Sequence, residues 1–340
     1  MTSDKAKILC IVFVAALAGA WCLFEGLNFS PITPGLFLAK ISAPVAPEKT
    51  NEFTMLFVGD IMLDRGVEYK IKKYSESDWR FPFLKIADYL ENNKTPGILI
   101  GNLEGPISDK GEKVGSIYSF RADPRVIDGL THAGFDVLSL ANNHLLDYGR
   151  LALIDTFARL SAAGIQYVGA GNSEAEAYSP AIKEVNGTRV AFLAYTNLGP
   201  LAWKAMGDKP GMALYDKLTL QKAIAAARQE ADIVIVMFHF GNEYQMKSSA
   251  LQQEIARFSI DSGADLVVGH HPHVSQEVEE YQGKYVAYSL GNFVFDQSFS
   301  PETMQGLILK ATVNNGEISQ VSTQKTQINE YFQPQVFSDN

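Results

Sequence analysis

Five apolar runs, each with the composition of a buried β-strand, end on side chains that bind metals or transfer protons. They occupy residues 54–60, 97–104, 137–144, 233–239 and 266–273. Because the carboxyl ends of strands in an open α/β sheet border the ligand crevice, residues far apart in sequence converge there. Strand ends of this chemistry predict one shared site.

The side chains at these strand ends offer nitrogen and oxygen ligands. The candidates are Asp60, Glu104, Asn142, Asn143, His144, His239 and the cluster of His270, His271 and His273. Taken singly, Asp60 could cap a helix and His239 could be a core histidine. The cluster from His270 to His273 is harder to place without a ligand, since it holds three of the chain's six histidines. The set suits Mn²⁺, Fe or Zn²⁺ rather than Ca²⁺, which prefers oxygen alone.

The composition indicates a globular protein and argues against a nucleic-acid-binding protein and a thiolate metal site. The 340 residues are 46% hydrophobic and 20% charged, which is enough for one large domain or two smaller ones. The formal net charge is −9, and Lys and Arg are scattered, so we expect no nucleic acid partner. Cys10 and Cys22 lie too far apart along a helix to form a disulfide, and the absence of other cysteines excludes thiolate metal sites.

The amino-terminal segment contains an uncharged apolar run, residues 8–24, preceded by Lys5 and Lys7. This run is at the short limit for a membrane span and slightly long for a signal-peptide core. We expect residues 1–27 to be an uncleaved transmembrane anchor, with a cleaved signal or a buried core helix as alternatives. The positive-inside rule then predicts a single-pass anchor in the cell membrane and an extracytoplasmic domain, or a secreted or periplasmic protein after cleavage.

The remaining chain divides into a linker, a domain and a tail. Residues 28–50 contain four prolines and predict a linker. Residues 51–327 are expected to form the domain, and residues 328–340 a polar, loosely held tail.

Within the domain, helical apolar spacing alternates with strand-like runs. The predicted helices cover residues 151–163, 217–229 and 250–262. Turn residues at Asn186-Gly187, Gln282-Gly283 and Asn315-Gly316 predict three hairpins. The pattern favours an α/β fold with largely parallel strands in a mixed sheet.

Short motifs follow one another in a distinctive order. They are Gly59-Asp60, Gly101-Asn-x-Glu104, Asn142-Asn143-His144, His239, Gly269-x-His271-Pro-His273 and the segment SLGNFVFD at residues 289–296. Over residues 53–310 this set resembles the capsule synthesis protein CapA (PgsA) family, which belongs with the calcineurin-like metallophosphatases. The resemblance implies a four-layer α-β-β-α sandwich with mixed sheets, preceded by a membrane anchor, with metals at the sheet edges.

The resemblance also implies a role for each candidate residue. Asp60 and His273 would hold a first metal, Asn143, His239 and His271 a second, and Glu104 would bridge the two. His144 matches the histidine that acts as general acid or orients the substrate oxyanion. His270 is the least certain member of its cluster.

Two positions depart from the superfamily pattern. Met62 stands where the first motif, Asp-x-His, has histidine, so the first metal loses an imidazole. Glu104 stands where an aspartate bridge is usual, and its longer side chain alters the bridge. A single-metal centre is therefore an alternative to a two-metal centre.

If the site is catalytic, a bound divalent ion would activate water for attack on an ester or amide, and His144 would protonate the leaving group. Arg65, Glu243 and Asn292 follow strand-end motifs and are candidates for substrate contact. A surface or loop-bracing role is equally open for each of these three.

Three functions remain open from the sequence. The first is a membrane-anchored extracytoplasmic factor of poly-γ-glutamate capsule synthesis, export or attachment. Its expected partners are the anionic polymer or its precursors, the membrane, and membrane-bound capsule synthesis proteins. The second is a phosphoesterase unrelated to capsule, and the third is a non-catalytic polymer-binding module. The acidic composition disfavours a polyanionic partner unless metals or a local basic patch compensate.

Overall fold

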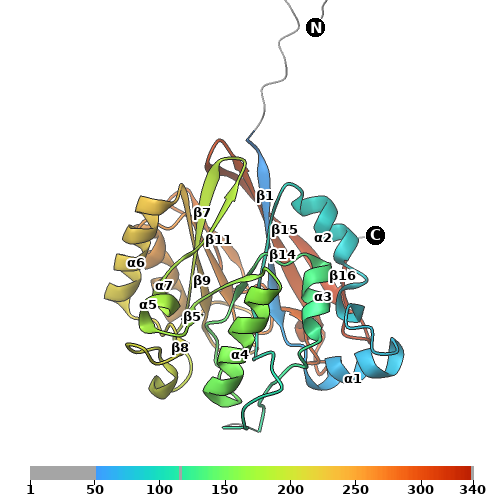
Figure 1. Ribbon diagram of the computed structural model, residues 1–340. Coiled ribbons are helices and arrows are strands. Elements are labelled where there is room, and N and C mark those ends of the chain that lie inside the picture. The colour runs from blue at the N-terminus through green and yellow to red at the C-terminus, as the bar shows by residue number, and fades with distance from the viewer. Residues whose placement is uncertain (1–50, 115–116, 338–340) are drawn as a thin grey trace, which may run out of the picture. The chain divides into compact units, whose positions relative to one another are not determined.

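The computed structural model describes residues 51–114 and 117–337, which form two β-sheets and the helices that cover them (Figure 1). The strands are β1 (Phe53–Ile61), β2 (Gly97–Leu103), β3 (Val137–Ser139), β4 (Gln166–Val168), β5 (Ala170–Gly171), β6 (Ala181–Val185), β7 (Thr188–Thr196), β8 (Gly211–Met212), β9 (Ile233–His239), β10 (Leu266–His270), β11 (Val278–Tyr281), β12 (Lys284–Ala287), β13 (Asn292–Val294), β14 (Gln305–Asn314), β15 (Glu317–Ile328) and β16 (Pro334–Val336). The helices are α1 (Arg65–Tyr74), α2 (Ala87–Lys94), α3 (Val126–Ala133), α4 (Gly149–Ala162), α5 (Glu174–Tyr178), α6 (Lys217–Glu230) and α7 (Ala250–Asp261), with 3-10 turns at Phe81–Phe83, Leu201–Trp203 and Glu302–Met304.

Both large sheets are mixed. The first sheet has the order β16-β15-β14-β1-β2-β3-β4, and β13 also pairs with β1. Within it β1 runs parallel to β2 and β13 but antiparallel to β14. The second sheet has the order β11-β12-β10-β9-β7-β6, with parallel strands at its centre and antiparallel strands at both edges. The strands β5 and β8 pair separately.

The hydrophobic core separates into three clusters that define four layers. The central cluster joins one face of each sheet, with Phe57 of β1 packing against Phe192 of β7. A second cluster lies between the first sheet and the helices α1 to α4, and a third between the second sheet and α6 and α7. The layers are therefore helices, sheet, sheet and helices, as expected from the resemblance (Figure 1).

The predicted helices and hairpins are confirmed within a residue or two. The helix predictions correspond to α4, α6 and α7, and the hairpins to β6–β7, β11–β12 and β14–β15. Side-chain caps fix two of the helix starts: Asp216 accepts from the backbone of Thr219, and Ser249 forms a capping box with Gln252. The expected loose tail is wrong for residues 328–337, because β16 pairs with β15 there.

Two glycines allow the segment before β13 to approach the strands that carry the site. A Cβ atom on Gly59 would lie 2.0 Å from the carbonyl oxygen of Gly291, and one on Gly269 would lie 2.0 Å from that of Tyr288. No side chain fits at either position. Close backbone packing therefore sets the positions of Asp60 and of the histidine cluster.

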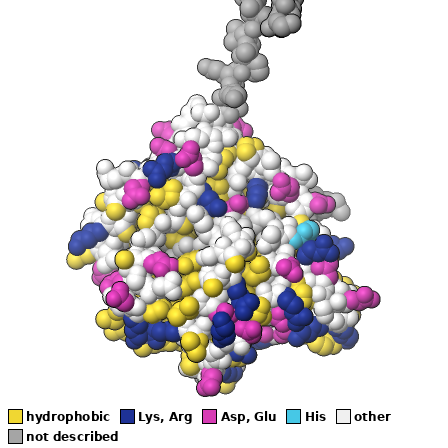
Figure 2. Space-filling view, viewed as in Figure 1, with side chains coloured by type: hydrophobic (Ala, Val, Ile, Leu, Met, Phe, Trp, Pro, Cys, Tyr) yellow, Lys and Arg dark blue, Asp and Glu magenta, His cyan; other side chains and the backbone are white. Residues whose placement is uncertain are grey.

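No helix in the described part of the chain is both long and apolar enough to cross a membrane. The predicted anchor and linker, residues 1–27 and 28–50, lie outside the described residues. On the face of the domain seen in Figure 2, acidic and basic side chains are interspersed, and no large field of one sign covers it.

Candidate metal centre

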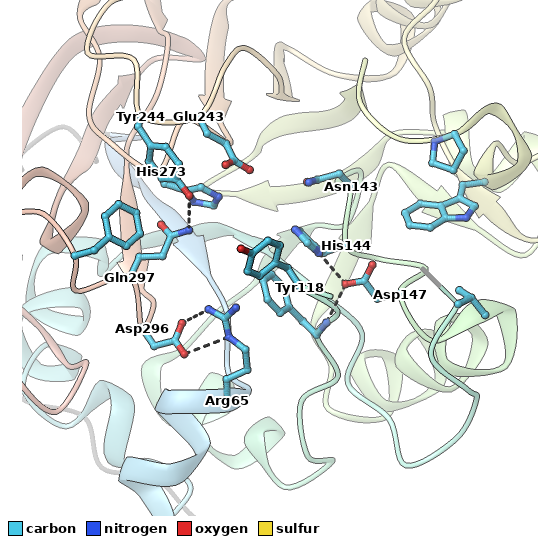
Figure 3. A pocket seen from close by; sticks show the side chains of 15 residues that line it. Arg65, Tyr118, Asn143, His144, Asp147, Glu243, Tyr244, His273, Asp296 and Gln297 are labelled. Atoms are coloured by element: carbon cyan, nitrogen blue, oxygen red, sulfur yellow. Dashed lines mark hydrogen bonds and ion pairs between the residues drawn. The ribbon is translucent and has the colours of Figure 1, made fainter. Parts of the chain in front are cut away.

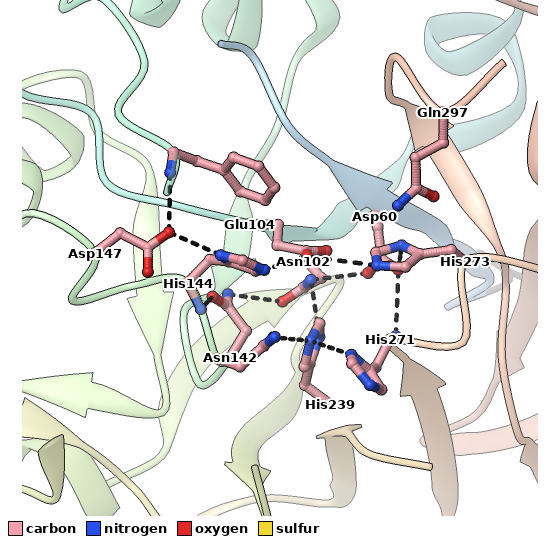
Figure 4. A network of polar contacts seen from close by, with 12 residues as sticks. Asp60, Asn102, Glu104, Asn142, His144, Asp147, His239, His271, His273 and Gln297 are labelled. Atoms are coloured by element: carbon pink, nitrogen blue, oxygen red, sulfur yellow. Dashed lines mark hydrogen bonds and ion pairs between the residues drawn. The ribbon is translucent and has the colours of Figure 1, made fainter. Parts of the chain in front are cut away.

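The five polar strand ends lie together at one edge of the domain. They belong to β1, β2 and β3 of the first sheet and to β9 and β10 of the second. Figure 4 shows their terminal side chains pointing toward one another. Both sheets contribute, so the site depends on how the sheets pack as well as on the order of strands within each.

One group of potential ligands combines two carboxylates and an imidazole. Asp60, Glu104 and His273 each place one ligand atom within 4.8 Å of the others, and all three are buried. The Nε2 atom of His273 lies 3.7 Å from Glu104 Oε1, and the Nδ1 atom on the other side of the ring lies 3.4 Å from Asp60 Oδ2.

A second group combines an amide oxygen with two imidazoles. His239 Nε2 lies 2.7 Å from Asn143 Oδ1 and 3.1 Å from His271 Nδ1. The Nε2 atom of His239 thus faces both of the other potential ligand atoms. The structure therefore places together the same two sets of residues that the resemblance assigned to two metals.

Glu104 supplies an independent test of whether a cation fits. Both of its carboxylate oxygens are buried and accept no hydrogen bond from any described residue. A buried carboxylate that accepts no hydrogen bond is costly, whereas a divalent ion would satisfy it. The donor set and the orphaned carboxylate together fit a divalent metal centre.

The electrostatics of the protein alone agree with this assignment. Burial raises the pKa of Glu104 to about 7, and the neighbouring Asp60 charge adds to the rise. Burial would lower the pKa of His273, but the Glu104 and Asp60 carboxylates outweigh it and raise that pKa to about 9. Burial lowers the pKa of His271 to about 3 and that of His239 well below its usual value. The lowered pKa values of His239 and His271 favour the neutral form that a metal-binding imidazole needs. The raised pKa of His273 favours its charged form in the protein alone, so a metal bound there would displace a proton.

The histidine-bearing loop after β10 adopts an unusual backbone conformation. His271 has φ of 99° and His273 has φ of 58°, in the left-handed region that residues other than glycine rarely occupy. Such conformations persist where the surrounding structure enforces them, and they cluster at functional sites. His270, by contrast, lies with Nε2 3.2 Å from the carbonyl oxygen of Val58, outside both ligand groups.

Asn102 is a central residue that the sequence reasoning quoted but gave no role. It pairs with Asp60 across β1 and β2, and its Nδ2 donates to Asp60 Oδ1 at 2.8 Å. The same Nδ2 lies 3.3 Å from His239 Nδ1, and its Oδ1 accepts from Asn142. The signal was present in the Gly-Asn-x-Glu motif, because Asn102 occupies the strand position beside Asp60.

Asn292, a predicted substrate contact, lies behind His273 and away from the cavity. It is fully buried and does not line the cavity beside the site. Its Oδ1 lies 3.0 Å from His273 Nδ1, and its Nδ2 donates to Gln297 and to the carbonyl of Thr303. Asn292 therefore orients His273 from behind, the usual arrangement for a metal-binding histidine.

His144 is held by Asp147, which the sequence reasoning did not single out. The Nδ1 atom of His144 lies 2.7 Å from Asp147 Oδ2, and that oxygen also accepts from the backbone of Phe120. The imidazole stacks on the Phe120 ring with centroids 4.1 Å apart. Nε2 then faces Glu104 at 3.7 Å. The pairing leaves one ring nitrogen directed at the centre and able to exchange a proton.

A cavity of about 790 Å³ opens over these residues (Figure 3). His144, Asn143 and His273 line its base, and the predicted contacts Arg65 and Glu243 also line it. Arg65 forms an ion pair with Asp296, and its guanidinium lies 4.6 Å from the Phe120 ring centroid. Aromatic side chains form much of the remaining wall, namely Tyr118, Phe120, Trp203, Tyr244 and Phe299.

Met62, the residue in place of the first-motif histidine, provides no ligand. It is fully buried in the cluster between the first sheet and its helices. Its Sδ accepts a hydrogen bond from the backbone of Asp64 at 3.2 Å. No imidazole stands at this position of the first motif, and the side chain that replaces it packs in the core.

The chain is similar to proteins of capsule biosynthesis. The family described as bacterial capsule synthesis protein PGA_cap matches residues 54–297. Capsule biosynthesis protein CapA of Bacillus anthracis is 36% identical over 286 residues, covering 81% of this chain and 67% of that protein. PGA biosynthesis protein CapA of Bacillus subtilis (strain 168) is 33% identical over 267 residues, covering 76% and 68%.

Among solved structures, the calcineurin-like phosphoesterase YfkN from Bacillus subtilis aligns with a TM-score of 0.48 and 16% identity, covering 86% of this chain and 94% of that one. The family match covers every residue of both ligand groups and most of the two sheets. The chain therefore belongs to the bacterial capsule synthesis protein PGA_cap family.

Proposed function

We propose that this protein is a membrane-anchored, extracytoplasmic factor of capsule biosynthesis that binds a poly-γ-glutamate-type polymer at a divalent metal centre and hydrolyses an amide bond in it. Family membership supports the link to capsule synthesis. The buried carboxylate of Glu104, which accepts no hydrogen bond and lies among carboxylate and imidazole groups, supports the metal centre.

The proposal that the protein hydrolyses an amide bond rests on the pair formed by His144 and Asp147. Asp147 accepts at Nδ1 and fixes the ring, so Nε2 faces the centre from the base of the cavity. A divalent ion held by the ligand groups would supply a Lewis acid there. As water adds to the amide carbon, His144 Nε2 would take a proton from it, and as the C–N bond breaks, the same Nε2 would give that proton to the departing nitrogen. A pure binding module has no need of a proton donor held in this way.

The acidic lining of the cavity explains why the metal would be needed to bind the anionic polymer, in addition to its role in hydrolysis. Among the described lining residues, Asp147, Glu243 and Asp296 are acidic, while Arg65 alone carries a Lys or Arg charge and is paired with Asp296. A polyanion would be repelled from such a cavity. One or two divalent ions would reverse the local sign and attract the polymer's carboxylates.

A binding and cleavage assay on the full-length protein tests the proposal. Labelled poly-γ-glutamate should bind the Mn²⁺-loaded protein, release new amino groups over time, and do neither after chelation. His239→Ala and His271→Ala should lose most of the bound metal together with both activities, while His132→Asn on α3 serves as the control. Polymer binding that survives chelation would contradict the proposal. Metal-dependent binding without cleavage would favour a binding module, and turnover of phosphoesters alone would favour a phosphoesterase.

The proposed location rests on the apolar run at residues 8–24 and the lysines before it. An alkaline-phosphatase-type reporter, which works only outside the cytoplasm, should be active when fused after Asn340. A stable but inactive fusion would refute the proposed topology.

A further inference from the structure

We propose that Glu243 is a metal ligand that compensates for the imidazole lost at Met62. The proposal rests on the metal centre of the proposed function but concerns a residue to which the sequence assigned substrate contact. Glu243 lies in the loop after β9, on a different sheet from Met62. It would thus restore the ligand count from the loop after β9 of the second sheet.

The position of the Glu243 carboxylate fits this role. One of its oxygens and one ring nitrogen each from His271 and His273 lie within 4.8 Å of one another. Figure 3 shows Glu243 beside His273 at the wall of the cavity. Ligand atoms on one ion, at bond lengths of about 2.0–2.2 Å, lie no more than about 4.4 Å apart. A small shift would complete the group, and Glu243 is exposed enough to shift without repacking the core.

His273 links this group to the first ligand group. Asp60, Glu104 and His273 supply three protein ligands, and Met62 packs in the core instead of adding a fourth. Protein metal centres commonly use at least four ligands, some of them water. Glu243 shares His273 with the first ligand group and has His271 of the second group as its other neighbour. As a ligand of the ion near His273, it would raise the number of protein ligands there to four.

The loop that carries Glu243 is tied to the loop that carries the histidines. The backbone N–H of Tyr244 donates to the carbonyl of Pro272 at 2.8 Å. Gln276 Nε2 donates to the carbonyls of Gln245 and Lys247 at 2.8 and 3.1 Å. Tyr244 also has a φ of 63°. A non-glycine residue held in this region next to Glu243 indicates that the surrounding structure enforces the loop's path.

The charge of the Glu243 carboxylate favours a role as metal ligand over a role as substrate contact. A carboxylate facing an anionic polymer across the cavity would oppose binding. The same carboxylate beside two imidazoles, coordinating a cation, would be stabilised and would no longer repel the polymer. The family's link to capsule synthesis therefore favours the ligand role.

Calorimetric titration of the metal-free full-length protein with Mn²⁺ tests this role. Glu243→Gln keeps the shape but removes the charge, and it should weaken binding of one ion by about 10- to 100-fold or more. Asp296→Asn is the matched control, because it removes one carboxylate charge from the same cavity without touching a proposed ligand. It should weaken binding much less. In Co²⁺-loaded protein, Glu243→Gln alone should change the ligand-field absorption, and Glu243→His should retain more metal than Glu243→Gln.

The outcomes distinguish this proposal from the broader one. Equal Mn²⁺ affinity and an unchanged Co²⁺ spectrum in Glu243→Gln would overturn the ligand role while leaving the metal centre intact. An equal loss of affinity in Glu243→Gln and Asp296→Asn would also overturn it, since general electrostatics would then suffice. A parent protein that binds no divalent ion would overturn both this inference and the proposed function.

Discussion

Replacing His144 by asparagine should separate proton transfer from metal binding. Asparagine retains an amide N–H that can reach Asp147, whose Oδ2 lies 2.7 Å from the present His144 Nδ1. It has no counterpart of Nε2, the atom that faces Glu104 at 3.7 Å. His144 belongs to neither of the two ligand groups that surround His273 and His239. We therefore expect near-parental metal content and polymer binding.

The expected loss of activity follows from the role of one general acid. Such a group contributes about 10²- to 10⁴-fold to a rate. This corresponds to about 2.7–5.4 kcal/mol of lost transition-state stabilisation, at about 1.36 kcal/mol for each factor of ten. Loss of ring stacking on Phe120, where the centroids lie 4.1 Å apart, should cost only about 0.5–1.5 kcal/mol of folding stability. The variant should remain folded.

Two measurements check this prediction. Elemental analysis should give equal metal content in the parent and His144→Asn, and amine release from polymer should fall by the factor above. His132→Asn, which alters an exposed histidine on α3, should change neither quantity. If His144→Asn holds its metal and fully restores capsule in a deletion strain, the protein does not use His144 as an acid and the binding-module alternative is preferred.

Two further substitutions test the supports of the site. Asn292→Ala removes the oxygen that lies 3.0 Å from His273 Nδ1, so it should lower metal affinity by about 10- to 100-fold. The control Asn93→Ala on α2 should leave metal affinity unchanged. Equal affinities of the two variants by calorimetry would show that Asn292 does not orient His273. Gly59→Ala places a Cβ 2.0 Å from the carbonyl of Gly291 and should lower the free energy of unfolding by about 1–3 kcal/mol or more in urea denaturation. An unchanged unfolding midpoint would mean that the backbone there yields without cost.

The sequence by itself predicted the five strands that end on polar side chains, the three hairpins and the residue types gathered at those strand ends. A buried strand shows as an apolar run whatever sheet it joins, so β1, β2, β3, β9 and β10 were all predictable. Turn pairs such as Asn186-Gly187 require positive φ, and this local requirement marks a hairpin directly. Each polar residue that ends a strand was visible for the same local reason.

Only the tertiary structure decided which polar residues face the centre and which support it. Asn292 and Glu243 both follow strand-end motifs, yet one lies buried behind His273 and the other beside it at the cavity wall. Asp147 lies three residues after His144, a spacing that is also typical of an ordinary turn. Only the structure shows that the Asp147 carboxylate contacts the His144 ring. These distinctions depend on how two sheets pack across a shared edge. Local sequence pattern carries no record of that packing, because burial and ligand geometry arise from contacts between residues far apart in the chain.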